Sequence, residues 1–206
     1  MKLRIVFLLV LLGVLSGCAT SPGSAYISVD TVENTAIYGE KSVIDNASPI
    51  PLEITDPSVI FISTIGINKD DPVIDFGDYK SHYKLFEFRA SKGENFRIRI
   101  FSKCDCLGFR KFILVPELYV ADANGSIIET DAINVHSELS HIYFELEGSA
   151  TYSGDYYLVF GANNSKPGKN IGVGEAKVNG YIPTGLILSN SSHPYGDVAP
   201  SYEIIK

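Results

Sequence analysis

Apolar and polar residues alternate most clearly in the middle of the chain. Residues 82–89 and 95–101 each place apolar side chains largely at every second position. This period of two predicts two β-strands that each bury one face. The residues predicted to face inward are Phe86, Phe88, Phe96, Ile98 and Ile100. Residues 91–94, Ser-Lys-Gly-Glu, supply the turn between the two strands.

Similar short segments occur on both sides of this pair. Further strands are predicted at residues 51–54, 58–63, 112–120, 126–129, 141–146, 155–160 and 202–206. Pro116, inside one of them, implies an edge strand or a bulge. Short strands separated by turn signals, with no segment of ten or more residues that is convincingly helical, predict an all-β fold. We therefore expect a β-sandwich, jelly-roll-like in topology, over residues 49–206.

Two segments depart from the strand pattern. Residues 161–180 are rich in Gly, Asn and Lys, which favours a long exposed loop of the kind that is often functional or mobile. Residues 19–48 are mixed and polar, which is typical of a tether. This tether is expected to order partly where Ile27, Val29 or Ile37 contacts the domain.

The N-terminus carries the features of a bacterial lipoprotein signal. Lys2 and Arg4 precede an apolar run at residues 5–14. This run is too short for a spanning helix, which needs about 20 residues. The next four residues, Leu-Ser-Gly-Cys, match the lipobox. We therefore expect residues 1–17 to be a signal peptide and Cys18 to receive lipid, including acyl chains such as palmitate. Residues 18–48 are then the lipidated cysteine and tether.

The lipid predicts where the chain resides. Several acyl chains on Cys18 exceed the two signals needed for stable anchoring, so the protein should sit on a membrane surface. Ala19 stands where an aspartate commonly retains lipoproteins at the inner membrane. The alanine at this position, in place of aspartate, favours the periplasmic face of the bacterial outer membrane.

Composition and charge limit the partners. Removal of residues 1–17 takes two of the 17 basic residues and leaves 15 against 24 acidic ones, a formal net charge of −9. Nucleic acid and anionic lipid headgroups are therefore expected to be poor partners. The content of 45% apolar and 20% charged residues is in the globular range and allows one domain with a buried core.

Several motifs resemble known secreted β-sandwiches. They are Tyr83-x-x-Phe86-x-Phe88, Gly93-Glu94-x-Phe96-x-Ile98-x-Ile100, residues 116–125 (Pro-Glu-Leu-Tyr-Val-x-Asp-x-Asn-Gly) and residues 154–159 (Gly-Asp-Tyr-Tyr-Leu-Val). Together they resemble the bacterial pre-peptidase C-terminal type of β-sandwich. Residues 50–206, with the ending Pro194-Tyr195-Gly196 and a final strand, are also similar to the maltose-operon periplasmic protein family. The resemblance implies a secreted accessory protein and brings no catalytic residues, although the cysteines near residue 105 and the 161–180 segment are not typical of that family.

Catalytic and zinc motifs are not found in the sequence. No G-x-S-x-G nucleophile elbow occurs, and there is neither H-x-x-x-H on a helix nor C-x-x-C. His82 and His141 fall in predicted strands, whereas His136 and His193 fall in loops or near turns. His136 and His141 could share a metal only in a suitable hairpin, so we expect no enzyme activity, no cofactor and ordinary structural histidines.

Acidic loops offer a weaker alternative, a calcium site. Asp122 and Asn124 present oxygens at alternate positions, as in part of a calcium loop, but Asn124-Gly125 also satisfies a hairpin turn without any metal. The turn is the favoured interpretation. A second acidic cluster, interpreted as a solvated loop, contains Asp70, Asp71, Asp75 and Asp78.

Tyrosines are the candidates for sugar binding, because the chain contains no Trp to form a strong aromatic platform. Tyr152, Tyr181 and Tyr195 lie in or beside predicted loops among Ser, Asn and Gly. They could bind a glycan if they converged on one face. Ordinary packing is the alternative for each.

Cys104 and Cys106 are the thiols that remain once Cys18 carries lipid. In an oxidising periplasm we expect them to form a disulfide. On a flat strand their Cα atoms would be roughly 6.6 Å apart, near the upper limit of disulfide geometry, so the bond requires a local turn. Free thiols, a reactive dithiol and a ligand pair for a soft metal remain alternatives.

Three classes of function follow. The leading hypothesis is a non-enzymatic envelope lipoprotein that binds another envelope protein or assists carbohydrate uptake, since this needs only a presented sheet face or edge. The alternative is a glycan-binding module with converging tyrosines. An envelope hydrolase ranks third, because it would need an acid or base with a perturbed pKa in a cleft.

Overall fold

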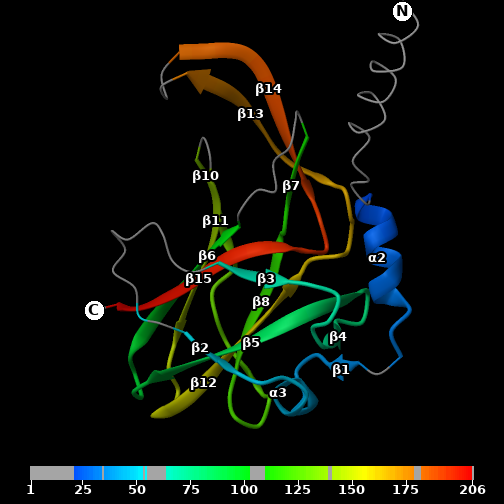
Figure 1. The fold of residues 1–206 in the computed structure, drawn as a ribbon. Coiled ribbons are helices and arrows are strands. Elements are labelled where there is room, and N and C mark those ends of the chain that lie inside the picture. Colours follow the sequence, from blue (N-terminus) through cyan, green and yellow to red (C-terminus); the bar gives the residue numbers. More distant parts are fainter. Residues whose placement is uncertain are drawn as a thin grey trace, which may run out of the picture.

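The fold comes from a computed structural model. It describes residues 21–33, 35–52, 54, 64–102, 110–138, 141–178 and 182–205. Strands account for 53% of the structure and helices for 9%, which confirms the all-β, sandwich-like class expected from the sequence. Figure 1 shows long strands that form the two main sheets, with the longer helix, α2 (Pro22–Asp30), at one side.

Two sheets form the body. The seven-stranded sheet contains β1 (Ala36–Ile37), β2 (Ile50–Pro51), β4 (Val73–Asp75), β5 (Lys80–Ala90), β8 (Pro116–Ala121), β9 (Ile127–Ile128) and β12 (Gly154–Ala162). Its order is β1-β4-β5-β12-β8-β9, with β2 beside β5. The five-stranded sheet contains β3 (Ile65–Ile67), β6 (Asn95–Ser102), β10 (Asn134–Glu138), β11 (His141–Ser149) and β15 (Gly196–Ile205). Its order is β10-β11-β6-β15-β3.

The main hydrophobic core is built from both sheets. All five residues that alternation placed inward are buried in it. Phe88 from β5 contacts Phe96 from β6, with ring centroids 5.1 Å apart. Gly93, at φ +84°, lies in the turn that joins these strands. The strands belong to different sheets, so the turn carries the chain from one layer to the other.

A second apolar cluster covers the opposite face of the seven-stranded sheet. Val43 packs onto the sheet from outside, and Tyr83, Leu85 and Val159 are contributed by the sheet itself. Val43 lies in the short helix α3 (Ser42–Asp45). The seven-stranded sheet is therefore packed on both faces.

Part of the segment expected to be a tether is helical. Helix α2 (Pro22–Asp30) begins at the N-cap Ser21, whose hydroxyl accepts a hydrogen bond from the Ser24 N–H. Ala25 and Val29, four residues apart on one side of the helix, are buried. The expected contact of Val29 with the domain is present, whereas Ile27 and Ile37 are exposed. No helix among the described residues is long and apolar enough to cross a bilayer.

A third sheet contains β7 (Arg110–Ile113), β13 (Asn170–Val178) and β14 (Ile182–Ser192), in the order β13-β14-β7. The β13 and β14 hairpin rises above the sandwich in Figure 1. The prediction of one exposed loop over residues 161–180 was therefore wrong for residues 161–162 and 170–178, which belong to β12 and β13, whereas residues 163–169 do form a loop. Gly-rich composition does not prevent backbone pairing, and β14 supplies the partner from Asn170↔Ser191 to Val178↔Ile182.

Most of the other predicted strands are present. Those at 126–129, 141–146, 155–160 and 202–206 correspond to β9, β11, β12 and the end of β15. The strand expected at 112–120 is divided, because β7 pairs with β14 and β8 pairs with β12. Pro116 begins β8, at this change of sheet. Of the described residues 51, 52 and 54, only Pro51 belongs to a strand, and Ile54 forms an isolated bridge with Tyr202. The prediction at 58–63 lies outside the described residues.

Candidate functional site

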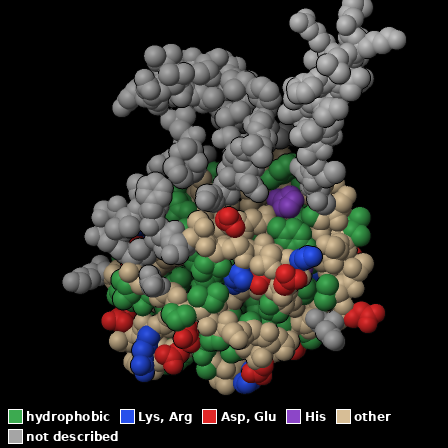
Figure 2. All heavy atoms as spheres, viewed as in Figure 1, with side chains coloured by type: hydrophobic (Ala, Val, Ile, Leu, Met, Phe, Trp, Pro, Cys, Tyr) green, Lys and Arg blue, Asp and Glu red, His purple; other side chains and the backbone are tan. Residues whose placement is uncertain are grey.

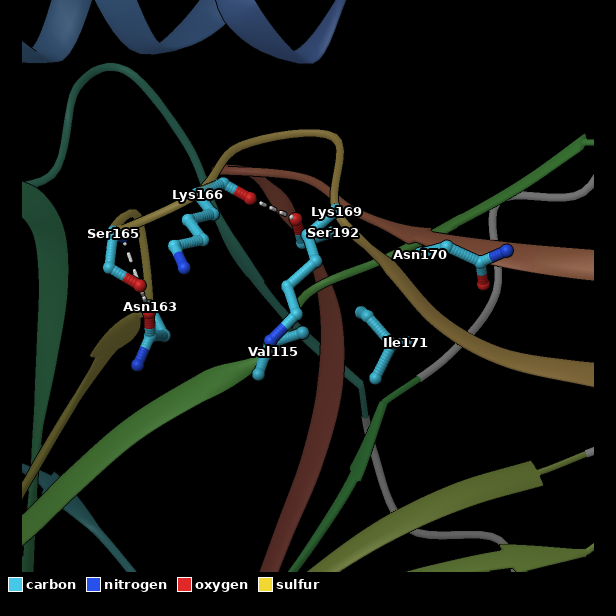
Figure 3. A pocket seen from close by; sticks show the side chains of 8 residues that line it. All are labelled: Val115, Asn163, Ser165, Lys166, Lys169, Asn170, Ile171 and Ser192. Atoms are coloured by element: carbon cyan, nitrogen blue, oxygen red, sulfur yellow. Dashed lines mark hydrogen bonds between the residues drawn. The ribbon is translucent and has the colours of Figure 1, made fainter.

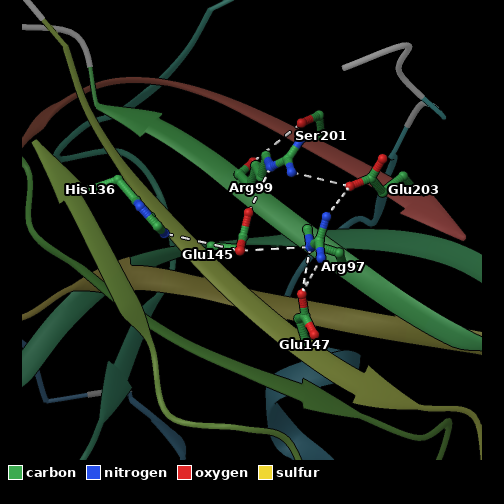
Figure 4. A network of polar contacts seen from close by, with 7 residues as sticks. All are labelled: Arg97, Arg99, His136, Glu145, Glu147, Ser201 and Glu203. Carbon is green, nitrogen blue, oxygen red and sulfur yellow. Dashed lines mark hydrogen bonds and ion pairs between the residues drawn. The ribbon is translucent and has the colours of Figure 1, made fainter. Parts of the chain in front are cut away.

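The outer face of the five-stranded sheet gathers charged and aromatic side chains in rows across the strands. Strand register places His136 opposite Tyr143, and Tyr143 opposite Phe101. The next outward row joins Glu145, Arg99 and Ser201, and the third joins Glu147, Arg97 and Glu203. We call these nine residues the outer sheet face. Figure 4 shows seven of them, with the charged side chains directed toward one another.

The two arginines hold the three glutamates in one network. Arg97 contacts Glu147 at 2.5 Å and Glu203 at 2.9 Å. Arg99 contacts Glu145 at 2.7 Å and Glu203 at 3.3 Å. The hydrogen bond to Glu147 is the main cause that raises the pKa of Arg97. The paired contacts fix the orientation of both guanidinium groups.

The aromatic row lies beside this network. The His136 and Tyr143 rings are stacked, with centroids 4.5 Å apart and planes 8° apart. Phe101 is next to Tyr143, at 5.4 Å. The prediction of His136 in a loop or near a turn was wrong, because it lies within β10. The residues around His136 are mostly polar, so the sequence did not indicate a strand. Pairing with β11 places His136 in one.

The charged side chains of the outer sheet face are held in place by one another but remain partly exposed to solvent. Its arginine and glutamate side chains are between 14% and 33% exposed, so they remain accessible to a partner. With two arginines and three glutamates the network has a formal charge of −1. In Figure 2, acidic and basic side chains are interspersed on the visible face of the molecule. The arrangement suits recognition by hydrogen bonds and ring edges rather than by bulk charge.

Tyr152 and Tyr195 lie at opposite ends of the same pair of strands. The Tyr152 ring stacks on Tyr156 at 4.6 Å, next to the start of β12. Tyr195 contacts His82 at 5.6 Å, near the start of β5. Because β5 and β12 are antiparallel, the start of β5 lies beside the end of β12. Both tyrosines also pack against the main core, so they do not converge on one face. Tyr181 lies outside the described residues.

A pocket of about 240 Å³ lies where the connection from β12 to β13 passes the end of β14. Its lining residues are Val115, Asn163, Ser165, Lys166, Lys169, Asn170, Ile171 and Ser192. Ser192 Oγ donates to the Lys166 carbonyl at 2.9 Å. The Gly168 N–H donates to the Ser192 carbonyl, also at 2.9 Å. These bonds fix the turn at residues 166–169 that carries both lysines, which Figure 3 shows directed into the pocket.

The Asp122 segment forms the hairpin turn that the sequence favours. Asp122 Oδ1 accepts hydrogen bonds from the Asn124 N–H at 2.8 Å and the Ser126 N–H at 2.9 Å. Gly125 has φ +82°, as a turn of this kind requires. Asp122 Oδ1 therefore stabilises the backbone of the turn.

Carboxylates of the second acidic cluster also form an ion pair and hydrogen bonds with nearby groups. Asp71 Oδ1 pairs with Lys84 at 2.6 Å, and Asp71 Oδ2 accepts from the Asn68 N–H. Asp75 Oδ1 accepts from the Gly77 N–H. In the described part of the chain, no three His, Cys, Asp or Glu side chains are grouped as a metal site.

Sequence reasoning did not single out the ion-pair network. The sequence did contain an indication of it. Arg97 and Arg99 alternate with apolar residues in one predicted strand, and Glu145 and Glu147 alternate with apolar residues at the end of another. Cys18, Cys104 and Cys106, the predicted lipidation and disulfide residues, lie outside the described ranges. Comparison with protein families, curated proteins and solved structures found no match.

Proposed function

We propose that the chain is a non-enzymatic lipoprotein of the bacterial envelope, anchored through lipid on Cys18 at the periplasmic face of the outer membrane. Its role is to bind another envelope protein through the outer sheet face. The observation that carries this proposal is the ordered, partly exposed network of Arg97 and Arg99 beside an aromatic row. Arginine and aromatic residues held in fixed positions are typical of the energetic centres of protein interfaces.

The same geometry favours a protein partner over a glycan. A sugar ring stacks on the open face of an aromatic ring, but the stacking of His136 on Tyr143 covers one face of each ring. Tyr152 and Tyr195 are separated by the length of β12 and do not form a common platform. The glycan-binding alternative therefore has less structural support.

The link to carbohydrate uptake rests on the sequence resemblance alone. Residues 50–206 are similar to the maltose-operon periplasmic protein family in their aromatic, Gly and Asp motifs. The partner we propose is accordingly an envelope protein of a carbohydrate uptake system. The accessory role requires neither a cofactor nor a catalytic group.

Site-specific photo-crosslinking in intact cells tests the interaction. A photoreactive amino acid at Phe101 should give a discrete crosslinked product with one envelope protein, whose identity mass spectrometry then establishes. The same label at Ile127, which is exposed on β9 in the other sheet, is the matched control. Equal crosslinking from both positions, or none from Phe101, would contradict the proposed interface.

Two assays separate the alternative functions. Calorimetric titration with maltooligosaccharides should show no binding, whereas saturable binding that is lost on substitution of Tyr152 or Tyr195 would favour the glycan alternative. Panels of peptide, ester and glycoside substrates should show no turnover. Turnover abolished by one Asp, Glu or His substitution would instead establish a hydrolase.

A further inference from the structure

The pocket turn lies against the beginning of helix α2. A Cβ atom built on Gly168 would lie 3.7 Å from Pro22 Cβ, so the two backbones are close neighbours. Figure 3 shows α2 passing over the loop that carries Lys166 and Lys169. The start of the helix and the mouth of the pocket therefore belong to one corner of the molecule.

Helix α2 packs against the sandwich. Val29 is fully buried, and Ser28 Oγ lies 3.1 Å from the Tyr195 hydroxyl. Just after the helix, Lys80 Nζ donates to the Val32 carbonyl at 2.6 Å. These contacts come from the sandwich and hold the C-terminal end of the helix.

This corner is also the part of the body nearest the predicted lipid. Cys18 precedes Pro22 by four residues, which span at most about 14 Å when fully extended. A lipid on Cys18 therefore brings Pro22, and with it the turn at residues 166–169, to the bilayer surface. A flexible tether of some thirty residues would have imposed no such restriction.

The charge at this corner is opposite to that of the whole chain. Lys166 and Lys169 are exposed, and neither ammonium group forms an ion pair with any described residue. The pocket lining contains no acidic residue. The nearby Glu117 carboxylate oxygen Oε2 already accepts hydrogen bonds from Asn163 Nδ2 at 2.7 Å and from the Tyr79 hydroxyl at 2.8 Å. Two lysines that form no ion pair with a described residue, at the rim of a pocket, can attract an anion.

We propose that Lys166 and Lys169 bind the phosphate group of an anionic lipid headgroup in the membrane that holds the Cys18 lipid. This inference rests on the proposed lipid anchoring. The ammonium groups pair with the phosphate oxygens, and the side chains of Val115 and Ile171 provide an apolar wall for the glycerol carbons. Headgroup binding would then set the orientation of the sandwich on the membrane, with the lipid anchor and the pocket as two points of attachment.

Native mass spectrometry of the purified, processed lipoprotein in a neutral detergent tests the site. Phosphatidylglycerol should remain bound as an adduct, and phosphatidylcholine should not. The variant Lys166→Gln/Lys169→Gln should lose the phosphatidylglycerol adduct about ten-fold or more, because each lysine near an anionic surface contributes several-fold to binding. Lys92→Gln, at an exposed lysine in the turn between β5 and β6, should retain it.

Each other outcome has a defined meaning. Equal adducts in the double variant and the parent, or equal retention of the two lipids, would overturn the proposal. Protection of Lys166 and Lys169 from acetylation by inorganic phosphate, without a lipid adduct, would replace the lipid by a soluble phosphate and also overturn it. The acyl mass on Cys18 is visible in the same spectrum, so a failure of lipid anchoring is recognised separately from a failure of headgroup binding.

Discussion

The hydroxyl group of Tyr83 donates a hydrogen bond to the backbone carbonyl of Val43, 2.9 Å away. Tyr83 is fully buried in β5, and Val43 is buried in α3. The bond therefore joins the seven-stranded sheet to the segment that covers its outer face. It satisfies two polar groups in an apolar cluster, where an unpaired group would be costly.

Replacement of Tyr83 by Phe should destabilise the protein. The substitution keeps the ring but leaves the Val43 carbonyl without this donor, which costs about 1 to 2 kcal/mol of unfolding free energy. Urea denaturation of the parent and Tyr83→Phe proteins measures the difference. Tyr157→Phe, at a partly buried tyrosine packed against the same cluster, should change the midpoint less. Equal effects would mean that the Tyr83 hydrogen bond adds nothing specific.

Alkaline pH should unfold the protein through its buried tyrosines. Burial raises the pKa of Tyr83 to about 12, and burial likewise raises the pKa of Tyr119 and of Tyr79. The unfolded chain loses these protons near pH 10 while the folded chain retains them, so unfolding free energy falls as the pH rises above about 10. Urea midpoints measured from about pH 9 to 11 should decline, and less steeply in Tyr83→Phe. A pH-independent midpoint would contradict this prediction.

The parts of the fold that follow from local sequence were predicted well. Alternation identified the inward faces of β5 and β6, because each of those strands buries one side in the main core. The turn at Asp122 followed from Asn124-Gly125, since the requirement for positive φ is local. In both cases the residues that decide the structure lie within a few positions of one another.

The parts that depend on distant residues were not predicted. β13 was taken for a loop because its partner β14 supplies the pairing, and α2 was taken for a tether because tertiary contacts of Val29 stabilise a helix that composition does not favour. The outer sheet face was missed for the same reason. Arg97 and Glu203 are 106 positions apart, and only the register of β6 with β15 places them together.

Gly125 should tolerate substitution much less than Gly77. Both glycines have positive φ, at +82° and +93°, so alanine at either position costs about 1 kcal/mol or more in backbone strain. A Cβ on Gly125 would also lie 2.5 Å from the backbone of Glu40 and Lys41, whereas a Cβ on Gly77 meets nothing within 4 Å. We expect Gly125→Ala to be more destabilising by about 2 kcal/mol. Equal losses in thermal unfolding would show that residues 40–41 move aside freely.

Replacement of Cys18 by Ala should leave an uncut precursor. The lipoprotein peptidase acts on the lipidated thiol, and alanine cannot receive the lipid. Mass spectrometry should therefore find residues 1–17 still attached, and no acyl mass on the chain. Ser21→Ala, which changes the α2 N-cap but not the lipobox, is the matched control and should be processed normally. Normal cleavage of the Cys18→Ala protein would refute the proposed anchoring.

Glu145 should contribute more to stability than an exposed carboxylate in a similar ion pair. It contacts Arg99 at 2.7 Å and Arg97 at 3.6 Å, and its side chain is only 14% exposed. Glu145→Gln retains the shape but removes the charge between two arginines, so we expect a loss of roughly 1 to 2 kcal/mol. Urea unfolding at low and high salt gives the value, and the loss should persist at high salt because the pair is partly shielded from solvent.

Asp45 provides the matched control for this substitution. Its pair with Lys41 has the same kind of geometry, at 2.6 Å, but the two side chains are 59% and 54% exposed. Asp45→Asn should therefore cost about 0.5 kcal/mol or less, and salt should remove most of that cost. A loss in Asp45→Asn as large as that in Glu145→Gln would show that the network on the five-stranded sheet has no special role. A difference in the expected direction would show that the network stabilises the folded five-stranded sheet more than an exposed ion pair does.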